Sequence, residues 1–195
     1  MTGKPLQVND CMDLLSLRRR PLRVVWIALI AIVAGVGLYQ AGQWWWRERR
    51  WRWIVVHHTA SDFGNLAYFK AMHQRERGWS DIAYHFLINN GTAGTAAGQI
   101  EESDLWRKRE GNYSTKVHTV NEFGIAIVLV GNFEKHPVPE LQMQSLLQLI
   151  LKLKKQYGIS PDHIVGHREL WQTACPGKHL NMAEVRRRLA EMEKR

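Results

Sequence analysis

The N-terminal part of the chain contains one long run of apolar residues. Residues 24–46 include no charged side chain, and arginines stand on both sides of the run. A helix needs about 20 residues to cross a bilayer, so this run is long enough to do so. Trp44, Trp45 and Trp46 close it, as expected of an aromatic belt at a membrane interface. The pattern predicts one transmembrane helix over 24–46.

A cleaved signal peptide is the alternative interpretation of this run. It would share the basic N-terminal flank, but no convincing cleavage motif follows, and Ala41-Gly42-Gln43 is a poor match. We therefore expect an uncleaved signal-anchor preceded by a short cytoplasmic tail, residues 1–23. Basic residues flank both ends, so the positive-inside rule says little about orientation. The function inferred below places the rest of the chain outside the cytoplasm.

The pattern changes after a short basic linker, residues 47–52. Short β-branched or apolar segments then alternate with amphipathic ones across a single domain, 53–195. Strands are expected at 53–59, 83–88, 97–100, 124–133 and 163–167, and helices at 65–77, 140–157 and 183–194. The nearly all-apolar segment 124–133 predicts a central strand that is covered on both faces. We expect an α/β (α+β) domain with a mixed central β-sheet flanked by helices.

Composition and charge narrow the class of protein. The chain is 45% hydrophobic and 23% charged, which is typical of a folded protein. Its formal net charge is +9, but the basic excess lies mainly beside the apolar run. That position suits anionic lipid headgroups. It does not support nucleic-acid binding, which would require the charge on the folded domain. We expect a membrane-attached monomer.

Three residues of the domain suggest a metal site. The two cysteines, Cys11 and Cys175, lie on opposite sides of the apolar run, so we expect no disulfide between them. His57 lies at the end of the first expected strand, and His167 and Cys175 are separated by one loop. Imidazole and thiolate are preferred zinc ligands, and three protein ligands leave a position for water. By spacing alone, however, a buried cysteine near a surface histidine is the commoner arrangement.

Several segments of the domain carry a family resemblance. They are residues 54–60 (IVVHHTA), 78–86 (GWSDIAYHF), 125–133 (IAIVLVGNF), 142–149 (QMQSLLQL), 164–167 (IVGH) and 174–177 (ACPG). In order and spacing they resemble the Amidase_2 family of N-acetylmuramoyl-L-alanine amidases, which includes the phage T7-type lysozyme and the animal peptidoglycan recognition proteins. The resemblance extends from Trp53 to about Leu189.

The resemblance implies roles for individual residues. His57, His167 and Cys175 correspond to the family's Zn2+ ligands. Tyr84 corresponds to a catalytic tyrosine that points at the metal site and the substrate. Thr173, two positions before the cysteine, corresponds to a second catalytic residue and matches the recognition-protein branch.

The neighbouring histidines are expected to have other roles. Side chains alternate between the two faces of a strand, so only one of His57 and His58 can face a metal. The same argument separates Tyr84 from His85. We expect His58 and His85 to be packing residues or to orient the ligands. Trp79 and Trp106 are candidates for sugar stacking, although ordinary packing is the commoner role for a tryptophan.

The sequence also departs from the family pattern. Some members carry a glutamate general base in the strand at 124–133, but the corresponding residue here is Val128, which leaves the general base unassigned. The family's HAxGxN-like segment is imperfect at residues 117–121, where His118 is either a substrate contact or a surface histidine. Glu169 stands near a ligand and is either an orienting acid or simply solvated.

The resemblance implies zinc-dependent hydrolysis of the amide between N-acetylmuramic acid and L-alanine in peptidoglycan or muropeptides. Two other classes of protein are the alternatives. A non-catalytic peptidoglycan receptor is the main alternative, but such relatives often replace the ligand cysteine, which is retained here as Cys175. A structural zinc module for nucleic acid would need four closed ligands, and no fourth is evident. The resemblance therefore favours an enzyme.

Overall fold

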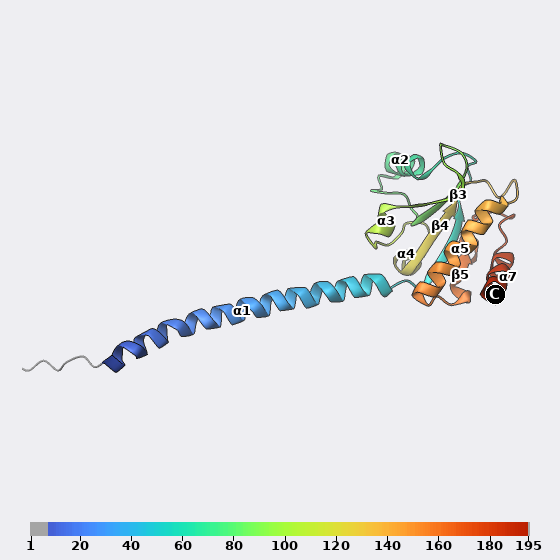
Figure 1. Ribbon diagram of the computed structural model, residues 1–195. Coiled ribbons are helices and arrows are strands. Elements are labelled where there is room, and N and C mark those ends of the chain that lie inside the picture. The colour runs from blue at the N-terminus through green and yellow to red at the C-terminus, as the bar shows by residue number, and fades with distance from the viewer. Residues whose placement is uncertain (1–7, 195) are drawn as a thin grey trace, which may run out of the picture. The chain divides into compact units, whose positions relative to one another are not determined.

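The computed structural model describes residues 8–194, with side chains from Leu22 onward. The chain divides into two compact units, Met1–Trp46 and Arg47–Arg195. Helix α1 runs over Val8–Arg49, beyond the predicted 24–46 at both ends (Figure 1). The side chains of residues 1–21, and with them Cys11 and most of the expected tail, lie outside the described residues.

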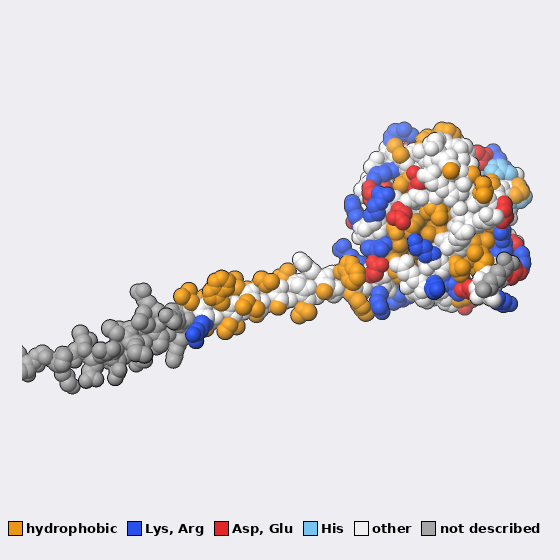
Figure 2. All heavy atoms as spheres, in the orientation of Figure 1, with side chains coloured by type: hydrophobic (Ala, Val, Ile, Leu, Met, Phe, Trp, Pro, Cys, Tyr) orange, Lys and Arg blue, Asp and Glu red, His pale blue; other side chains and the backbone are white. Residues whose placement is uncertain are grey.

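The described part of α1 has the properties of a membrane span. Leu22–Arg49 contains an 18-residue window of mean hydropathy 2.2, none of which is buried within the protein. A core helix of comparable hydropathy would be covered by its own domain. Hydrophobic side chains cover the visible face of this helix (Figure 2). By length and composition, α1 is a candidate for crossing a bilayer.

The second unit is built on a five-stranded sheet. Its strands are β1 Trp53–His58, β2 Phe86–Asn90, β3 Ala97–Glu102, β4 Gly124–Leu129 and β5 Ile164–Gly166. The strand order is β3-β2-β4-β1-β5. β1 is parallel to both β4 and β5, β2 is parallel to β4, and only the edge strand β3 is antiparallel. The predicted mixed sheet is confirmed, with β4 and β1 near its centre.

Helices cover the sheet as expected (Figure 1). They are α2 Leu66–Arg77, α3 Asp104–Arg107, α4 His118–Phe123, α5 Glu140–Tyr157, α6 His167–Leu170 and α7 Met182–Glu193, with a 3-10 turn at Pro161–His163. The main core lies between the sheet and α5 and α7. There Leu146, Ile150 and Leu153 are at most 1% exposed, and each such burial contributes roughly 1.5–3 kcal/mol. The predicted α/β class is confirmed.

The opposite face of the sheet carries a smaller apolar cluster. Leu87 of β2 and Val128 of β4 pack there against Phe69 of α2. In β1 the alternation sends Ile54 and Val56 toward the main core, and Val55 to the opposite face. His57 follows the same alternation as Val55, so it lies on the face opposite α5.

The bounds of all five strands differ from the sequence prediction, although β1, β3 and β4 differ at their C-terminal ends alone. β2 begins at Phe86 and not at residue 83, because the backbone N–H of Ala83 is taken by the His73 ring (3.1 Å to Nδ1) and not by a neighbouring strand. β4 ends at Leu129 rather than at 133. β5 contains only Ile164–Gly166, because His167 already begins helix α6.

Candidate metal centre and active site

The topology of the sheet brings two histidines together. β1 and β5 are adjacent and parallel, and Val56 is in register with Gly166. The next residues along the two strands are His57 and His167. Both therefore lie at the carboxyl edge of the sheet, where open α/β folds place their ligands.

Cys175 reaches the same edge on a tightly packed loop. The Thr173 hydroxyl accepts a hydrogen bond from the Cys175 N–H at 3.2 Å, and the Arg168 guanidinium donates to the Ala174 carbonyl. A Cβ added to Gly166 would lie 3.1 Å from the Pro176 ring. The absence of a side chain at Gly166 therefore lets the loop pack directly on β5, which places the cysteine beside the two histidines.

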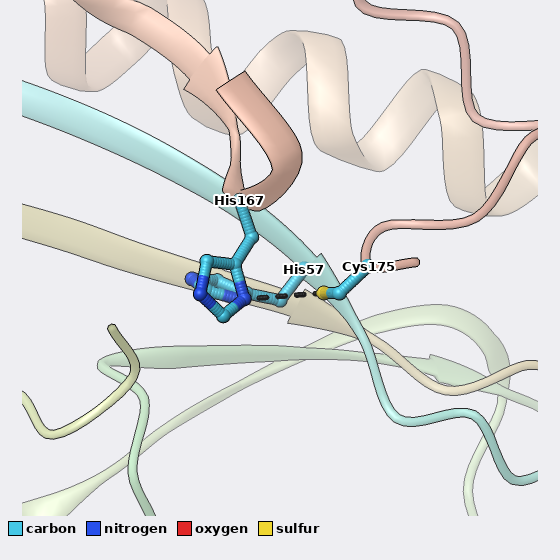
Figure 3. Close-up of side chains that lie close together, drawn as sticks. All are labelled: His57, His167 and Cys175. Atoms are coloured by element: carbon cyan, nitrogen blue, oxygen red, sulfur yellow. Dashed lines mark hydrogen bonds between the residues drawn. The ribbon is translucent and has the colours of Figure 1, made fainter. Parts of the chain in front are cut away.

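The three side chains converge on one point (Figure 3). Ligand atoms of His57, His167 and Cys175 all lie within 4.8 Å of one another, and the Cys175 Sγ is 3.5 Å from the His57 Nδ1. Ligands bound tetrahedrally at about 2.0 Å (N) and 2.3 Å (S) stand roughly 3.3–3.6 Å apart. The cluster that the sequence predicted is therefore close to a size that one zinc ion would bridge.

Burial sets the protonation of this cluster. It lowers the pKa of His57 well below its usual value, and the neighbouring rings of His167 and His58 lower it further. Burial also lowers the pKa of His167. It raises the pKa of the Cys175 thiol to about 11, against a hydrogen bond from the His58 backbone and the positive charge of Arg168. Both imidazoles are thus neutral near pH 7, as metal ligands must be.

The hydrogen-bonding of the two ligand rings also fits a metal. Among the described residues the buried Nε2 of His167 has no hydrogen-bond partner, and the Nδ1 of His57 faces the Cys175 Sγ. A buried polar atom without a partner costs about 1–3 kcal/mol, and such atoms are uncommon in native proteins. Rings with free nitrogen atoms beside a thiol are suited to Zn2+ coordination.

Gly177 is required by the ligand loop, and its replacement should be costly. Its φ is +101°, and an added Cβ would lie 2.4 Å from the Phe133 carbonyl carbon. Gly177→Ala should lower the free energy of unfolding by roughly 2–5 kcal/mol, from backbone strain and overpacking together. Urea unfolding of the full chain in detergent measures this effect.

Gly158→Ala is the matched control for that substitution. Gly158 also has a positive φ, +66°, but an added Cβ would meet no atom within 4 Å. Its replacement should cost only about 1 kcal/mol. Equal losses at the two glycines would show that the packing against Phe133 does not matter.

Tyr84 lies beside the ligand set, as the resemblance implied. Its ring centroid is 5.1 Å from that of His57. Burial raises the pKa of its phenol, and the nearby Cys175 raises it further. The hydroxyl therefore remains protonated at neutral pH and can donate a hydrogen bond.

His73 on α2 was not anticipated from the sequence. Its ring lies 6.2 Å from Tyr84 and 5.3 Å from Trp79, between centroids, and Trp79 in turn lies 5.6 Å from Tyr113. These rings form a partly exposed aromatic wall that leads away from Tyr84. Trp79 thus remains a candidate for sugar stacking. The one signal in the sequence that could have indicated this role is the position of His73 on the side of an amphipathic helix that faces the domain.

Neighbouring polar residues hold the framework of the centre. The His58 Nδ1 accepts a hydrogen bond from the Phe133 N–H at 3.2 Å. Glu169 accepts one from the Gly166 N–H at 2.7 Å and pairs with Arg186 at 2.9 Å. Glu169 therefore fixes the turn that presents His167, and it is not simply solvated.

Three further residues contribute less directly. His118 is exposed in the first turn of α4 and, among the described residues, forms no hydrogen bond, ion pair or ring contact with the ligand set. Val128 is fully buried and lies in register with His57, so no acid occupies that position. Trp106 is only 7% exposed and packs in the main core against Phe86, which makes it a poor candidate for sugar stacking.

Comparison with known proteins agrees with this geometry. The sequence model of the N-acetylmuramoyl-L-alanine amidase family matches residues 47–178. The chain is 32% identical over 142 residues to peptidoglycan recognition protein 1 of Bos taurus, which covers 66% of this chain and 68% of the bovine protein. The residues matched by the family model include His57, Tyr84, His167 and Cys175.

Two solved structures share the fold. The amidase LysC from Clostridium intestinale superimposes with a TM-score of 0.59 at 29% identity, covering 74% of this chain and 88% of LysC. A variant of Drosophila PGRP-LB in complex with tracheal cytotoxin gives a TM-score of 0.52 at 26% identity, covering 68% and 78%. The similar proteins thus include both named amidases and named recognition proteins.

Proposed function

Because the chain belongs to the N-acetylmuramoyl-L-alanine amidase family, we propose that it hydrolyses the amide between N-acetylmuramic acid and L-alanine in peptidoglycan or muropeptides, with Zn2+ as cofactor. The observation that carries this proposal is the convergence of His57, His167 and Cys175 within 4.8 Å. Tyr84, beside them, completes the set that a hydrolytic site of this family requires.

The residues divide the work as follows. His57, His167 and Cys175 would hold the zinc, which supplies an activated water and polarises the scissile carbonyl when bound. The Tyr84 hydroxyl, kept protonated by burial, donates a hydrogen bond to the oxygen on which negative charge develops. Donors placed in advance in this way contribute about 3 kcal/mol each. Thr173 would act as the second catalytic residue on the other side of the substrate, and its hydroxyl also accepts a hydrogen bond from the Cys175 N–H.

Mass spectrometry of the products tests the proposal directly. The full chain in detergent, loaded with zinc, is incubated with purified muropeptides. We expect free stem peptides that begin with L-alanine, and we expect a chelator to abolish their release. Intact muropeptides after incubation with the zinc-loaded protein would overturn the proposed reaction.

A non-catalytic peptidoglycan receptor is the second candidate function. It is favoured by the similarity to recognition proteins such as the bovine relative. The complete ligand set and the protonated Tyr84 favour the enzyme, because a receptor needs neither. Muropeptide binding without turnover, at full zinc occupancy, would assign the chain to the receptor class.

We also propose that α1 is an uncleaved anchor and that the domain lies outside the cytoplasm. The exposed apolar surface of Leu22–Arg49 supports the anchor. The proposed substrate, peptidoglycan, supports a location of the domain outside the cytoplasm. Alkaline extraction of membranes, followed by N-terminal sequencing, separates an anchor from a cleaved signal. A soluble product lacking residues 24–46 would contradict the anchor.

Zinc loading should release a proton from the thiol. Below its pKa of about 11, Cys175 is protonated in the zinc-free protein, whereas both ligand histidines are neutral. Because zinc binds the thiolate, about one proton should be released per ion near pH 6, where a metal-bound water with a pKa of about 7 contributes little. Release should decline as the pH approaches the thiol pKa. Calorimetry in buffers of different ionisation enthalpy measures it, and zero release would contradict coordination by Cys175.

A further inference from the structure

Residues 48–51, the last two residues of α1 and the two that follow, contact the rest of the Arg47–Arg195 unit. Arg50 and Trp51 are only 6% and 0% exposed. The Arg50 Nη1 pairs with the Glu122 carboxylate at 2.6 Å, and its Nη2 donates to the Arg109 carbonyl at 2.8 Å. Arg109 pairs in turn with Glu48 at 2.8 Å. We call residues 48–51 the docked segment, because the ion pairs of Glu48 and Arg50 and the burial of Arg50 and Trp51 attach it to the domain.

Within this segment, the Trp51 side chain is buried in the main core. Its ring meets that of His85 edge to face, with centroids 5.0 Å apart and planes at 76°. Trp106 packs on it at 5.5 Å. Aromatic pairs in this arrangement contribute about 0.5–1.5 kcal/mol beyond their buried area. The indole therefore supports one side of His85.

His85 is held by four hydrogen bonds. Its Nδ1 accepts from the Ala126 N–H at 3.0 Å, and its Nε2 donates to the Glu110 carbonyl at 2.9 Å. Its backbone N–H donates to the Ala126 carbonyl, and its own carbonyl accepts from the Ser103 N–H. Only the neutral imidazole with its proton on Nε2 can make both ring bonds. Burial lowers the pKa of His85 to about 4, so this form prevails at neutral pH.

Tyr84 depends on this neighbour for its position. It lies two residues before the start of β2, so it is not paired with a residue of a neighbouring strand. On one side Ala83 is held by His73 and Tyr113, through its N–H and its carbonyl. On the other side lies His85, with its bonds to β4 and to two loops.

We propose that Trp51 is a positioning residue for the amidase site: its indole holds His85 and so fixes the Tyr84 hydroxyl beside the metal ligands. The proposal rests on the proposed function, because it assumes that Tyr84 acts on the substrate. It makes the docked segment part of the catalytic unit. Trp51, the second residue after α1, thus contributes to catalysis without contacting the substrate.

Substitution of Trp51 in the full chain tests the proposal. A misplacement of about 1 Å at a reacting group can cost up to ~100-fold in rate. We therefore expect Trp51→Leu to lower kcat on soluble muropeptides by ~10–100-fold, while KM and the zinc content per chain stay near the wild-type values. Trp51→Phe retains an aromatic ring against His85 and should recover most of the rate.

Trp53→Leu is the matched control. Trp53 is partly buried, and its ring stacks on His163 at 3.9 Å, with no ring contact to His85. Its loss should affect stability but leave kcat close to that of the wild type. If Trp53→Leu lowers kcat as much as Trp51→Leu does, or if the rate of zinc-loaded Trp51→Leu equals that of the wild type, the positioning role is wrong.

A readout independent of turnover separates this proposal from the proposed function. Long-range proton–nitrogen spectra should show His85 as the Nε2–H tautomer in the wild type and in Trp51→Phe, and a mixed population in Trp51→Leu. If the wild type is inactive but the tautomer shifts as expected, the amidase function fails while the contact with His85 stands. Should Trp51→Leu not fold, Glu122→Gln weakens the docked segment at Arg50 without opening the core, and it should lower kcat with unchanged zinc content. An unchanged rate in that variant would overturn the proposal.

Discussion

Cys175→Ser is expected to remove zinc from the protein and to abolish amide hydrolysis. Cys175 is one of the three proposed ligands, whose donor atoms lie within 4.8 Å of one another, and a serine hydroxyl is a much weaker zinc ligand because it remains protonated near pH 7. Loss of an orienting neighbour alone costs about 10–100-fold in metal affinity, so loss of a direct ligand should exceed 100-fold. Zinc per chain, measured by atomic emission after dialysis, and product release by mass spectrometry check this.

The chain supplies its own control for that substitution. Cys11 lies before the apolar run, on the far side of it from Cys175 in the sequence. Cys11→Ser should therefore retain about one zinc per chain and the wild-type rate. Full activity of Cys175→Ser without bound zinc would show that the cluster is not the reactive centre.

Tyr84→Phe is expected to lower kcat by ~100- to 1,000-fold, the usual effect of removing one preorganised donor to a developing oxyanion. The ring, at 5.1 Å from His57, would still fill its place, so zinc content and KM should change little. Because burial raises the pKa of the phenol, its ionisation should not limit the rate at neutral or mildly alkaline pH. Steady-state kinetics on muropeptides, with zinc measured on the same samples, give the result.

Tyr68→Phe serves as the comparison. Tyr68 is an exposed residue of α2, and its ring contacts Phe63 and Phe69 and not the ligand set. Removing its hydroxyl should leave kcat within a few fold of the wild type. A rate for Tyr84→Phe similar to that of Tyr68→Phe would remove Tyr84 from the mechanism.

Much of the fold could be predicted because it depends on local pattern. The leucines of 140–157 recur at helical spacing and Gly158 ends the helix, and α5 occupies those residues. Alternation along 53–59 correctly separated His57 from His58, since the side-chain period of a strand is fixed by its geometry. The same argument also separated Tyr84, which lies against His57, from His85, which lies against Trp51, although β2 begins only at Phe86. Just before β2, the Ala83 N–H bonds to the His73 ring of α2 and not to a strand partner, and no local sequence pattern reveals such a contact.

The sequence by itself determined the presence of an apolar helix and, through the family resemblance, named the candidate ligands of the centre, because residue types, motifs and short-range periodicity need no tertiary information. Only the tertiary structure decided that His57 and Cys175, 118 positions apart, lie 3.5 Å from each other. It also decided that His73 faces Tyr84 and that Trp51, expected in a basic linker, is fully buried against His85. Contacts of this kind arise from strand register and from packing between distant segments, and the free energy that selects them belongs to the whole domain.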